Sequence, residues 1–142
     1  MITNSVELKK ILSSKGIKPT YQRLKILECI QGSGKHLTAD SVYRVLVKEL
    51  PTISKTTVYN TLKAFLKKEI LVPLTITGTE VRFDYNTHPH HHLLCEKCGR
   101  IIDVNVLCPN LHRKEISGHC IHELHGYFRG VCSDCMKKLS KH

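Results

Sequence analysis

Two pairs of cysteines have the spacing of metal ligands, Cys95 with Cys98 and Cys132 with Cys135. The two-residue gap inside each pair lets both sulfurs turn toward one point, and four thiolates complete the tetrahedron that zinc prefers. Such a set leaves no open position for a substrate, so the expected zinc is structural and not catalytic. Two disulfides or four unrelated buried thiols are the alternatives, and the repeated spacing favours zinc.

A histidine run just before the first cysteine pair supplies a second group of candidate ligands. In an extended segment the side chains alternate, so His90 and His92 point to one face and His91 to the other. Asp84 precedes this run and Asp103 follows it. Imidazoles with carboxylates suit divalent iron, manganese or zinc and disfavour monovalent copper, which prefers sulfur. A solvated histidine tract is the alternative.

The 142-residue chain has a formal net charge of +10, most of which lies in its first half. Residues 1–70 hold 13 Lys and Arg against 5 Asp and Glu, a net of +8, whereas residues 71–142 hold 9 against 7, a net of +2. This asymmetry indicates a polyanionic partner for the first half, because phosphate neutralisation supplies most nonspecific affinity for nucleic acid. A solvated basic face is the alternative, and charge by itself does not decide between them.

Length and composition predict a soluble, cytoplasmic protein of two small domains. No apolar run approaches the ~20 residues that span a bilayer, and the first residues lack the basic and apolar regions of a secretory signal. No membrane partner is therefore expected. In a reducing compartment the seven cysteines are expected as metal ligands or small core residues, not as disulfides.

Hydrophobic periodicity predicts four helices in the first half of the chain. The first covers residues 4–15, and the others begin after the capping residues Thr20, Thr38 and Ser54. In the third, Val42, Val45 and Leu46 are placed inward. Two strand-like runs, residues 71–76 and 81–85, are joined by a turn signal at residues 77–79. Helices followed by such a hairpin predict a winged helix-turn-helix.

The fourth helix is the expected DNA reader, because its outer face is polar and basic. Asn60 can pair bidentately with adenine, and the methyl group of Thr56 or Thr57 can meet that of thymine. An A·T-rich palindromic operator in double-stranded DNA is therefore predicted. A basic surface helix without a DNA role is the alternative. The predicted DNA-binding residues are Lys55, Thr56, Thr57, Tyr59, Asn60 and Lys63.

A second domain begins where the composition changes, near the histidine run. We expect residues 1–85 to form the first domain, residues 86–89 a hinge and residues 90–142 the second domain. Strands are predicted at residues 93–96 and 100–104, a helix at about residues 110–117 and a strand at about residues 127–131. The predicted fold class is α+β.

Five motifs run in order along the chain: Gly34–Asp40 around His36, Thr57–Leu62, Arg82–Asp84, His90-x-His92-x-x-Cys95-x-x-Cys98-Gly99 and Gly130–Cys135. Taken together, these motifs resemble the ferric uptake regulator family over nearly the whole chain. That resemblance implies a bacterial homodimeric transcription repressor, with a winged-helix DNA-binding domain followed by a small α/β dimerisation domain that carries a four-cysteine zinc site.

The resemblance also implies particular ligands. Structural Zn²⁺ falls on Cys95, Cys98, Cys132 and Cys135, and a regulatory Fe²⁺ or Mn²⁺ falls on His36, Asp84, His90, His92 and Asp103. Aspartate at positions 84 and 103, where iron sensors more often have glutamate, resembles the peroxide-sensing branch of the family. In that branch peroxide and bound iron oxidise a ligand histidine, which here would be His36 or His90, and Mn²⁺ would block this chemistry.

One ion held by all five regulatory residues would fix the angle between the two domains, because His36 belongs to the first domain and three of the others to the second. A sensor of iron or zinc availability without oxidative chemistry stays open, as does a third metal site found in some family members. A metal-dependent hydrolase and a zinc-stapled interaction module without DNA binding are alternatives of other classes. No general base or substrate cradle is evident, so the chain is not expected to be an enzyme.

Overall fold

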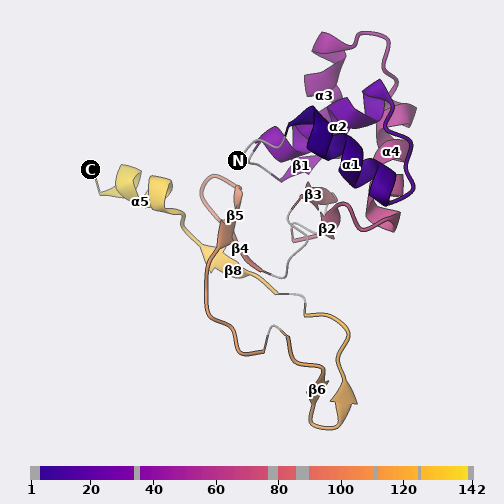
Figure 1. Ribbon diagram of the computed structural model, residues 1–142. Helices are drawn as coiled ribbons and strands as arrows, with labels where there is room; N and C mark the ends of the chain where they lie inside the picture. The colour runs from indigo at the N-terminus through magenta and orange to yellow at the C-terminus, as the bar shows by residue number, and fades with distance from the viewer. Residues whose placement is uncertain are drawn as a thin grey trace. The chain divides into compact units, whose positions relative to one another are not determined.

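A computed structural model describes residues 4–33, 36–76, 80–85, 90–110, 112–124 and 126–140 (Figure 1). The chain divides into two compact units, Met1–Thr87 and His88–His142. The turn expected at residues 77–79 and the hinge expected at residues 86–89 lie outside the described residues. No helix within the described ranges is long and apolar enough to cross a membrane.

Four helices make up most of the first unit, and the predicted capping residues begin three of them. Thr38 and Ser54 each accept a backbone amide from the first turn of the helix that follows. The Thr20 hydroxyl accepts the amide of Arg23 at 3.4 Å in the same way. Local hydrogen bonds therefore set where these helices start. The helices are α1 (Ser5–Ser14), α2 (Tyr21–Ser33), α3 (Ala39–Glu49) and α4 (Lys55–Lys67).

The apolar faces of these helices meet in one core. Val58, Leu62 and Phe65 of α4 share one face at helical spacing and are buried, as predicted, so the opposite face is left to solvent. The prediction that Val45 points inward is wrong, because this residue is 48% exposed. It lines a surface cavity of about 420 Å³ between α2 and α3, together with Cys29.

A three-stranded antiparallel sheet in the order β1–β3–β2 completes the first unit. Strands β2 (Val72–Leu74) and β3 (Arg82–Asp84) form the predicted hairpin. Strand β1 (Leu37–Thr38), which precedes α3, was not predicted. Leu37 pairs with Phe83 and Thr38 with Arg82, so the register places His36 opposite Asp84. Helices followed by this hairpin form the expected winged helix-turn-helix.

The second unit contains a three-stranded sheet in the order β5–β4–β8. Strand β4 (His91–Cys95) pairs antiparallel with β5 (Ile101–Val104) and parallel with β8 (Phe128–Gly130). These three strands agree with the predicted ones. A short helix, α5 (Ser133–Leu139), follows Cys132 and was not predicted. Helices and sheets together confirm the α+β class.

The helix predicted at about residues 110–117 is wrong. This part of the chain instead contains the strand β6 (Glu115–Ile116), which pairs with β7 (His119–Cys120). Ser117 and Gly118 lie between them with φ of 53° and 83°, the left-handed conformation that a two-residue hairpin turn requires. Both strands are exposed, so a short helix would have no buried apolar face to stabilise it.

Candidate metal centres and DNA-reading helix

The four paired cysteines meet within the second unit. Parallel pairing of β4 with β8 places Cys95 beside Gly130, just before the second cysteine pair. The sulfurs of Cys95 and Cys135 are 3.9 Å apart, and those of Cys98 and Cys132 are 3.8 Å apart. A zinc–sulfur bond of ~2.3 Å gives a tetrahedron with edges of about 3.8 Å, whereas a disulfide needs about 2.05 Å. The cysteines therefore fit zinc.

Backbone amides favour the thiolate at two of these sulfurs. The amides of Cys98 and Cys132 point at Cys95 and lower its pKa to about 6. The amide of Cys135 lowers the pKa of Cys132, and the Arg100 side chain adds to this effect. Hydrogen bonding to Cys132 and burial raise the pKa of Cys135 to about 12. A metal that binds this cluster must therefore displace a proton from Cys135.

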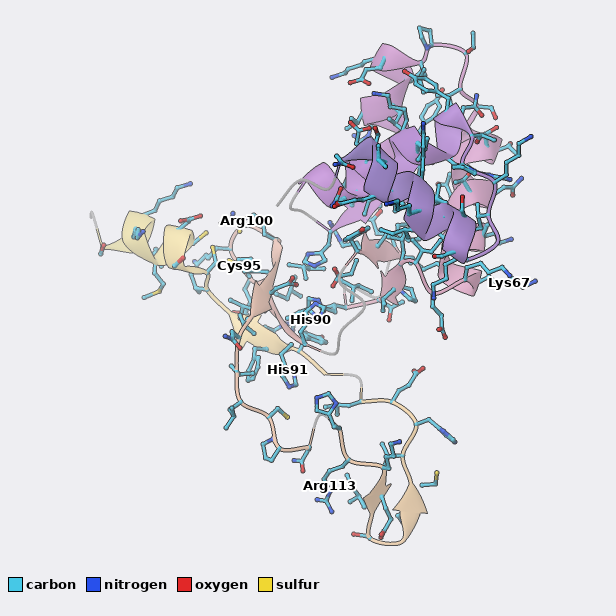
Figure 2. The ribbon with its side chains drawn as sticks, in the orientation of Figure 1. Lys67, His90, His91, Cys95, Arg100 and Arg113 are labelled. Carbon is cyan, nitrogen blue, oxygen red and sulfur yellow. The ribbon has the colours of Figure 1, made fainter. Side chains whose placement is uncertain are left out.

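Arg100 lies against two of the sulfurs. Its Nε donates to Cys98 Sγ at 3.4 Å, and its Nη2 donates to Cys132 Sγ at 3.3 Å and to Asp134 Oδ2 at 2.8 Å. The guanidinium in turn lowers the pKa of Asp134. Figure 2 labels Arg100 and Cys95 at the turn between β4 and β5. Sequence reasoning missed Arg100, although its place directly after the Cys-x-x-Cys-Gly turn is a usable signal.

His36 and Asp84 form a buried pair in the first unit. Nε2 of His36 lies 3.5 Å from Oδ2 of Asp84, and the two side chains are 9% and 7% exposed. Arg82 Nη1 donates to the backbone carbonyl of His36 at 2.9 Å and so fixes the start of β1. An imidazole nitrogen facing a carboxylate oxygen can form an ion pair or hold two positions of a divalent metal.

Three further candidate ligands meet in the second unit. Nε2 of His92 and Nε2 of His90 lie 3.2 Å and 3.3 Å from the same oxygen, Oδ1 of Asp103. The β4–β5 register sets His92 opposite Asp103. The ring of His91 instead lies 5.8 Å from the ring of Phe128, in agreement with the expected alternation (Figure 2).

The five predicted regulatory residues thus form a pair in the first unit and a trio in the second. Each group is assembled by the register of two strands, and each combines imidazole with carboxylate. Divalent iron and manganese commonly take six ligands of this kind. Neither group by itself supplies them.

The outer face of α4 carries the predicted DNA-binding residues. Lys55, Thr56, Tyr59, Asn60 and Lys63 are exposed, whereas Thr57 is half-buried. The Thr57 hydroxyl lies 2.9 Å from that of Ser54, within the cap that begins the helix.

Tyr59 has a partner that the sequence did not reveal. Its hydroxyl donates to Asp40 Oδ1 at 3.0 Å, and this hydrogen bond raises the pKa of Tyr59. Asp40 stands in the first turn of α3, where a negative charge is stabilised by the helix dipole. The Tyr59 hydroxyl is therefore held in place, although 45% of the residue is exposed.

A family model confirms the resemblance drawn from the motifs. The model of the ferric uptake regulator family matches residues 14–119. The chain belongs to this family. Its members regulate transcription in response to metals.

Relatives within the family are close over most of the chain. The peroxide-responsive repressor PerR of Staphylococcus aureus strain Mu50 is 38% identical over 134 residues, which cover 89% of this chain and 88% of that protein. A solved structure of PerR from Streptococcus pyogenes, described as a basis for peroxide sensing and gene regulation, is 28% identical with a TM-score of 0.53 and covers 92% of both chains. The ferric uptake regulator of Vibrio cholerae is also 28% identical, with a TM-score of 0.67, and covers 88% of this chain and 99% of that one.

Proposed function

We propose that this family member is a cytoplasmic, metal-dependent DNA-binding repressor that senses peroxide through oxidation of a ligand histidine. The observation that carries the proposal is the presence of two ligand groups: His36 with Asp84, which are buried, and His90 and His92 with Asp103, whose side chain is 47% exposed. The first group offers two ligand residues and the second three, so an ion that prefers six ligands comes closest to a full set when both groups bind it. The 38% identity to a peroxide-responsive repressor supports the same function.

A regulatory Fe²⁺ or Mn²⁺ held by these five residues would couple the two units. His36 directly precedes β1 and α3, and Asp84 ends β3, the strand that pairs with β1. A metal held by this pair would therefore act on the unit that carries α4. Such a cation can shift the domain arrangement only by binding one arrangement more tightly than others. Repression then requires the arrangement in which all five residues reach one ion.

DNA binding is assigned to the outer face of α4. Asn60 and Thr56 are short polar groups near the start of the helix, where they suit contacts with A·T base pairs. Lys55 and Lys63 suit phosphate contacts, which position the protein without reading sequence. A homodimer would present two such helices to a palindromic operator, with half-sites ~34 Å or a multiple of that apart.

Peroxide sensing is assigned to His36 or His90. Bound ferrous iron would supply the electrons that cleave the peroxide O–O bond at this site. The net change at the side chain is the insertion of one oxygen atom into an imidazole C–H bond, while the second peroxide oxygen leaves as water. An oxidised His36 or His90 is a poorer ligand, so the ligand set would fail and DNA would be released.

The first experiment tests whether DNA binding depends on these ligands. A pool of duplexes with a randomised centre is selected with Mn²⁺-loaded protein, and the recovered duplex serves as the operator probe in titrations. His36→Ala should abolish Mn²⁺-dependent binding while the four-cysteine zinc stays bound. His91→Ala is the matched control, because its ring lies against Phe128. Unchanged operator affinity in His36→Ala would contradict the shared-ion model.

The second experiment tests the oxidative chemistry. Protein loaded anaerobically with Fe²⁺ receives a small amount of peroxide, and its peptides are analysed by mass spectrometry while DNA release is followed. One added oxygen on the His36 or His90 peptide is expected, and Mn²⁺-loaded protein should show none. Unmodified histidines with intact metal-dependent DNA binding would instead identify a sensor of metal availability.

A further inference from the structure

The four candidate zinc ligands differ in their access to solvent. Cys95 and Cys132 are 1% and 2% exposed, and Cys135 is half-buried. Cys98 is the exposed member of the set. A small oxidant in solution therefore reaches the sulfur of Cys98 most readily. In a protein that meets peroxide as its signal, this sulfur needs protection.

Arg100 is placed to give that protection. Its Nε donates to Cys98 Sγ, and its Nη2 bridges Cys132 Sγ and Asp134 Oδ2. The fork of the guanidinium therefore spans two sulfurs, and the carboxylate of Asp134 holds the fork in place. Four thiolates around Zn²⁺ carry a net negative charge, which the fixed cation of Arg100 partly offsets.

We propose that Arg100 shields the Cys98 thiolate from peroxide, so that the zinc survives while oxidation takes place at the histidine site. This inference rests on the proposed function, because only a protein that meets peroxide needs such a shield, and it also requires zinc at the four cysteines. Arg100 acts here as a positioning and shielding residue and not as a ligand.

The reaction that Arg100 would slow can be written in two steps. A lone pair of the Cys98 thiolate attacks one oxygen of hydrogen peroxide, the O–O bond breaks, and a sulfenic acid and hydroxide form. The Cys132 thiolate, 3.8 Å away, then attacks that sulfur, a disulfide forms and a second hydroxide leaves. Two thiolates and one peroxide thus give one disulfide and two hydroxides, and zinc loses two ligands. The N–H···S hydrogen bond from Arg100 engages the sulfur lone pair that attacks peroxide, so it slows the first step.

The test measures zinc release by peroxide. Protein carrying zinc at the cysteines and Mn²⁺ at the regulatory site receives excess hydrogen peroxide, and a chromophoric chelator reports released zinc over time. Mn²⁺ keeps iron chemistry out of the assay. Arg100→Gln should release zinc about 10-fold faster than the wild type, in line with other groups that support metal ligands. Arg100→Lys should fall between them, because lysine keeps the charge but not the fork.

A matched control is available in the same unit. Arg129 Nε faces Glu96 Oε1 at 3.8 Å, so Arg129→Gln removes the same charge without touching a sulfur bond described above. Its release rate should equal that of the wild type. Peptide mapping of the Arg100→Gln protein should show the first oxidation at Cys98. First oxidation at another cysteine would contradict the shield.

Other outcomes separate the shield from the proposed function. Equal or slower release in zinc-loaded Arg100→Gln overturns the shield, and slower release would mean that Arg100 activates peroxide instead. If Arg100→Gln purifies without zinc, Asp134→Asn is used instead. This substitution keeps Arg100 but removes the carboxylate that holds its guanidinium in place. Zinc release about 3-fold faster than in the wild type is expected from the loss of one charge-assisted hydrogen bond. An unchanged rate in Asp134→Asn overturns the shield. Wild-type protein without zinc contradicts the zinc site itself.

Discussion

The first unit buries sixteen hydrophobic residues in one core, whereas the buried hydrophobic residues among those described in the second unit are Cys95, Ile101 and Cys132. Two of these three are candidate zinc ligands. A unit of this size with so small an apolar core needs another source of stability, and a structural metal is a common one. The comparison teaches that packing stabilises the first unit, and it leads us to expect that the second unit depends on zinc at its four cysteines.

This difference bears on the regulatory ligands. Strand β4 carries His92 of the ligand trio and ends at Cys95 of the cysteine cluster. Zinc at the four cysteines would therefore fix the strand from which part of the trio projects. The pair of His36 and Asp84 instead lies on the sheet of the first unit, beside its apolar core.

The largest expected effect is the loss of zinc from the second unit. Cys132→Ser should remove the metal and unfold residues 90–140 while the first unit stays folded, because structural zinc contributes roughly 10–16 kcal/mol to the folding of small metal domains. Zinc content by elemental analysis and limited proteolysis measure the result. Cys120→Ser, an exposed cysteine outside the cluster, is the control. Resistance of residues 90–140 to proteolysis in the zinc-free protein would show that the second unit does not depend on zinc.

A large-to-small change in the first unit should have the opposite pattern. Phe65→Ala removes the ring of the largest fully buried side chain and leaves a cavity. It should lower the free energy of unfolding by about 3–5 kcal/mol. Zinc content should not change. Denaturant titration followed by circular dichroism measures the loss. Val45→Ala, at an exposed position, should stay within about 0.5 kcal/mol of the wild type. Loss of zinc in Phe65→Ala would show that the units are not independent.

Paired substitutions sharpen the comparison at the regulatory ligands. Asp84→Ala and Asp103→Ala remove one carboxylate from each unit. Each should weaken Mn²⁺ binding by at least about 100-fold, because loss of a direct ligand costs more than loss of the outer partners of ligands, which costs roughly 10–100-fold. Calorimetric titration of the zinc-loaded protein measures the affinity. Glu96→Gln, which alters a carboxylate of the second unit away from the trio, is the control. Weakening by only one of the two alanine variants would place the ion within a single unit.

The smallest expected effect concerns the reading helix. Asp40→Ala removes the acceptor that raises the pKa of Tyr59 above its usual value of 10.0. The phenol should then titrate at lower pH, toward that usual value, as followed by NMR of ¹³C-labelled tyrosine. Operator affinity should fall about 3- to 10-fold, the equivalent of one hydrogen bond. Asp40→Asn keeps an acceptor and should retain most of the affinity. A Tyr59 pKa that does not move would show that Asp40 does not hold the hydroxyl.

Features with a local cause could be predicted. The caps at Thr38 and Ser54 and the inward face of α4 depend on residues within one or two helical turns. The geometry within each cysteine pair is local for the same reason, because Cys95 and Cys98 flank a turn, and Cys132 and Cys135 lie at the first turn of α5. The family motifs added His36 as a predicted ligand, which its surroundings in the sequence did not suggest, and the structure places it 3.5 Å from Asp84.

Features that join distant segments could not be predicted. The exposure of Val45 depends on which neighbours α3 meets, and the hairpin at residues 115–120 replaced a helix that had no surface to pack against. The hydrogen bond between Tyr59 and Asp40 joins two helices. The contacts of Arg100 with Cys132 and Asp134 join the residue just before β5 to the start of α5.

The sequence by itself determined the ligand chemistry, the helix starts and the order of the elements, because side-chain type and short-range hydrogen bonds suffice for these. The tertiary structure alone decided that His36 stands opposite Asp84 and that a guanidinium covers the exposed sulfur. Both depend on strand register and on packing between segments far apart in the chain, and neither leaves a periodic signal in the sequence.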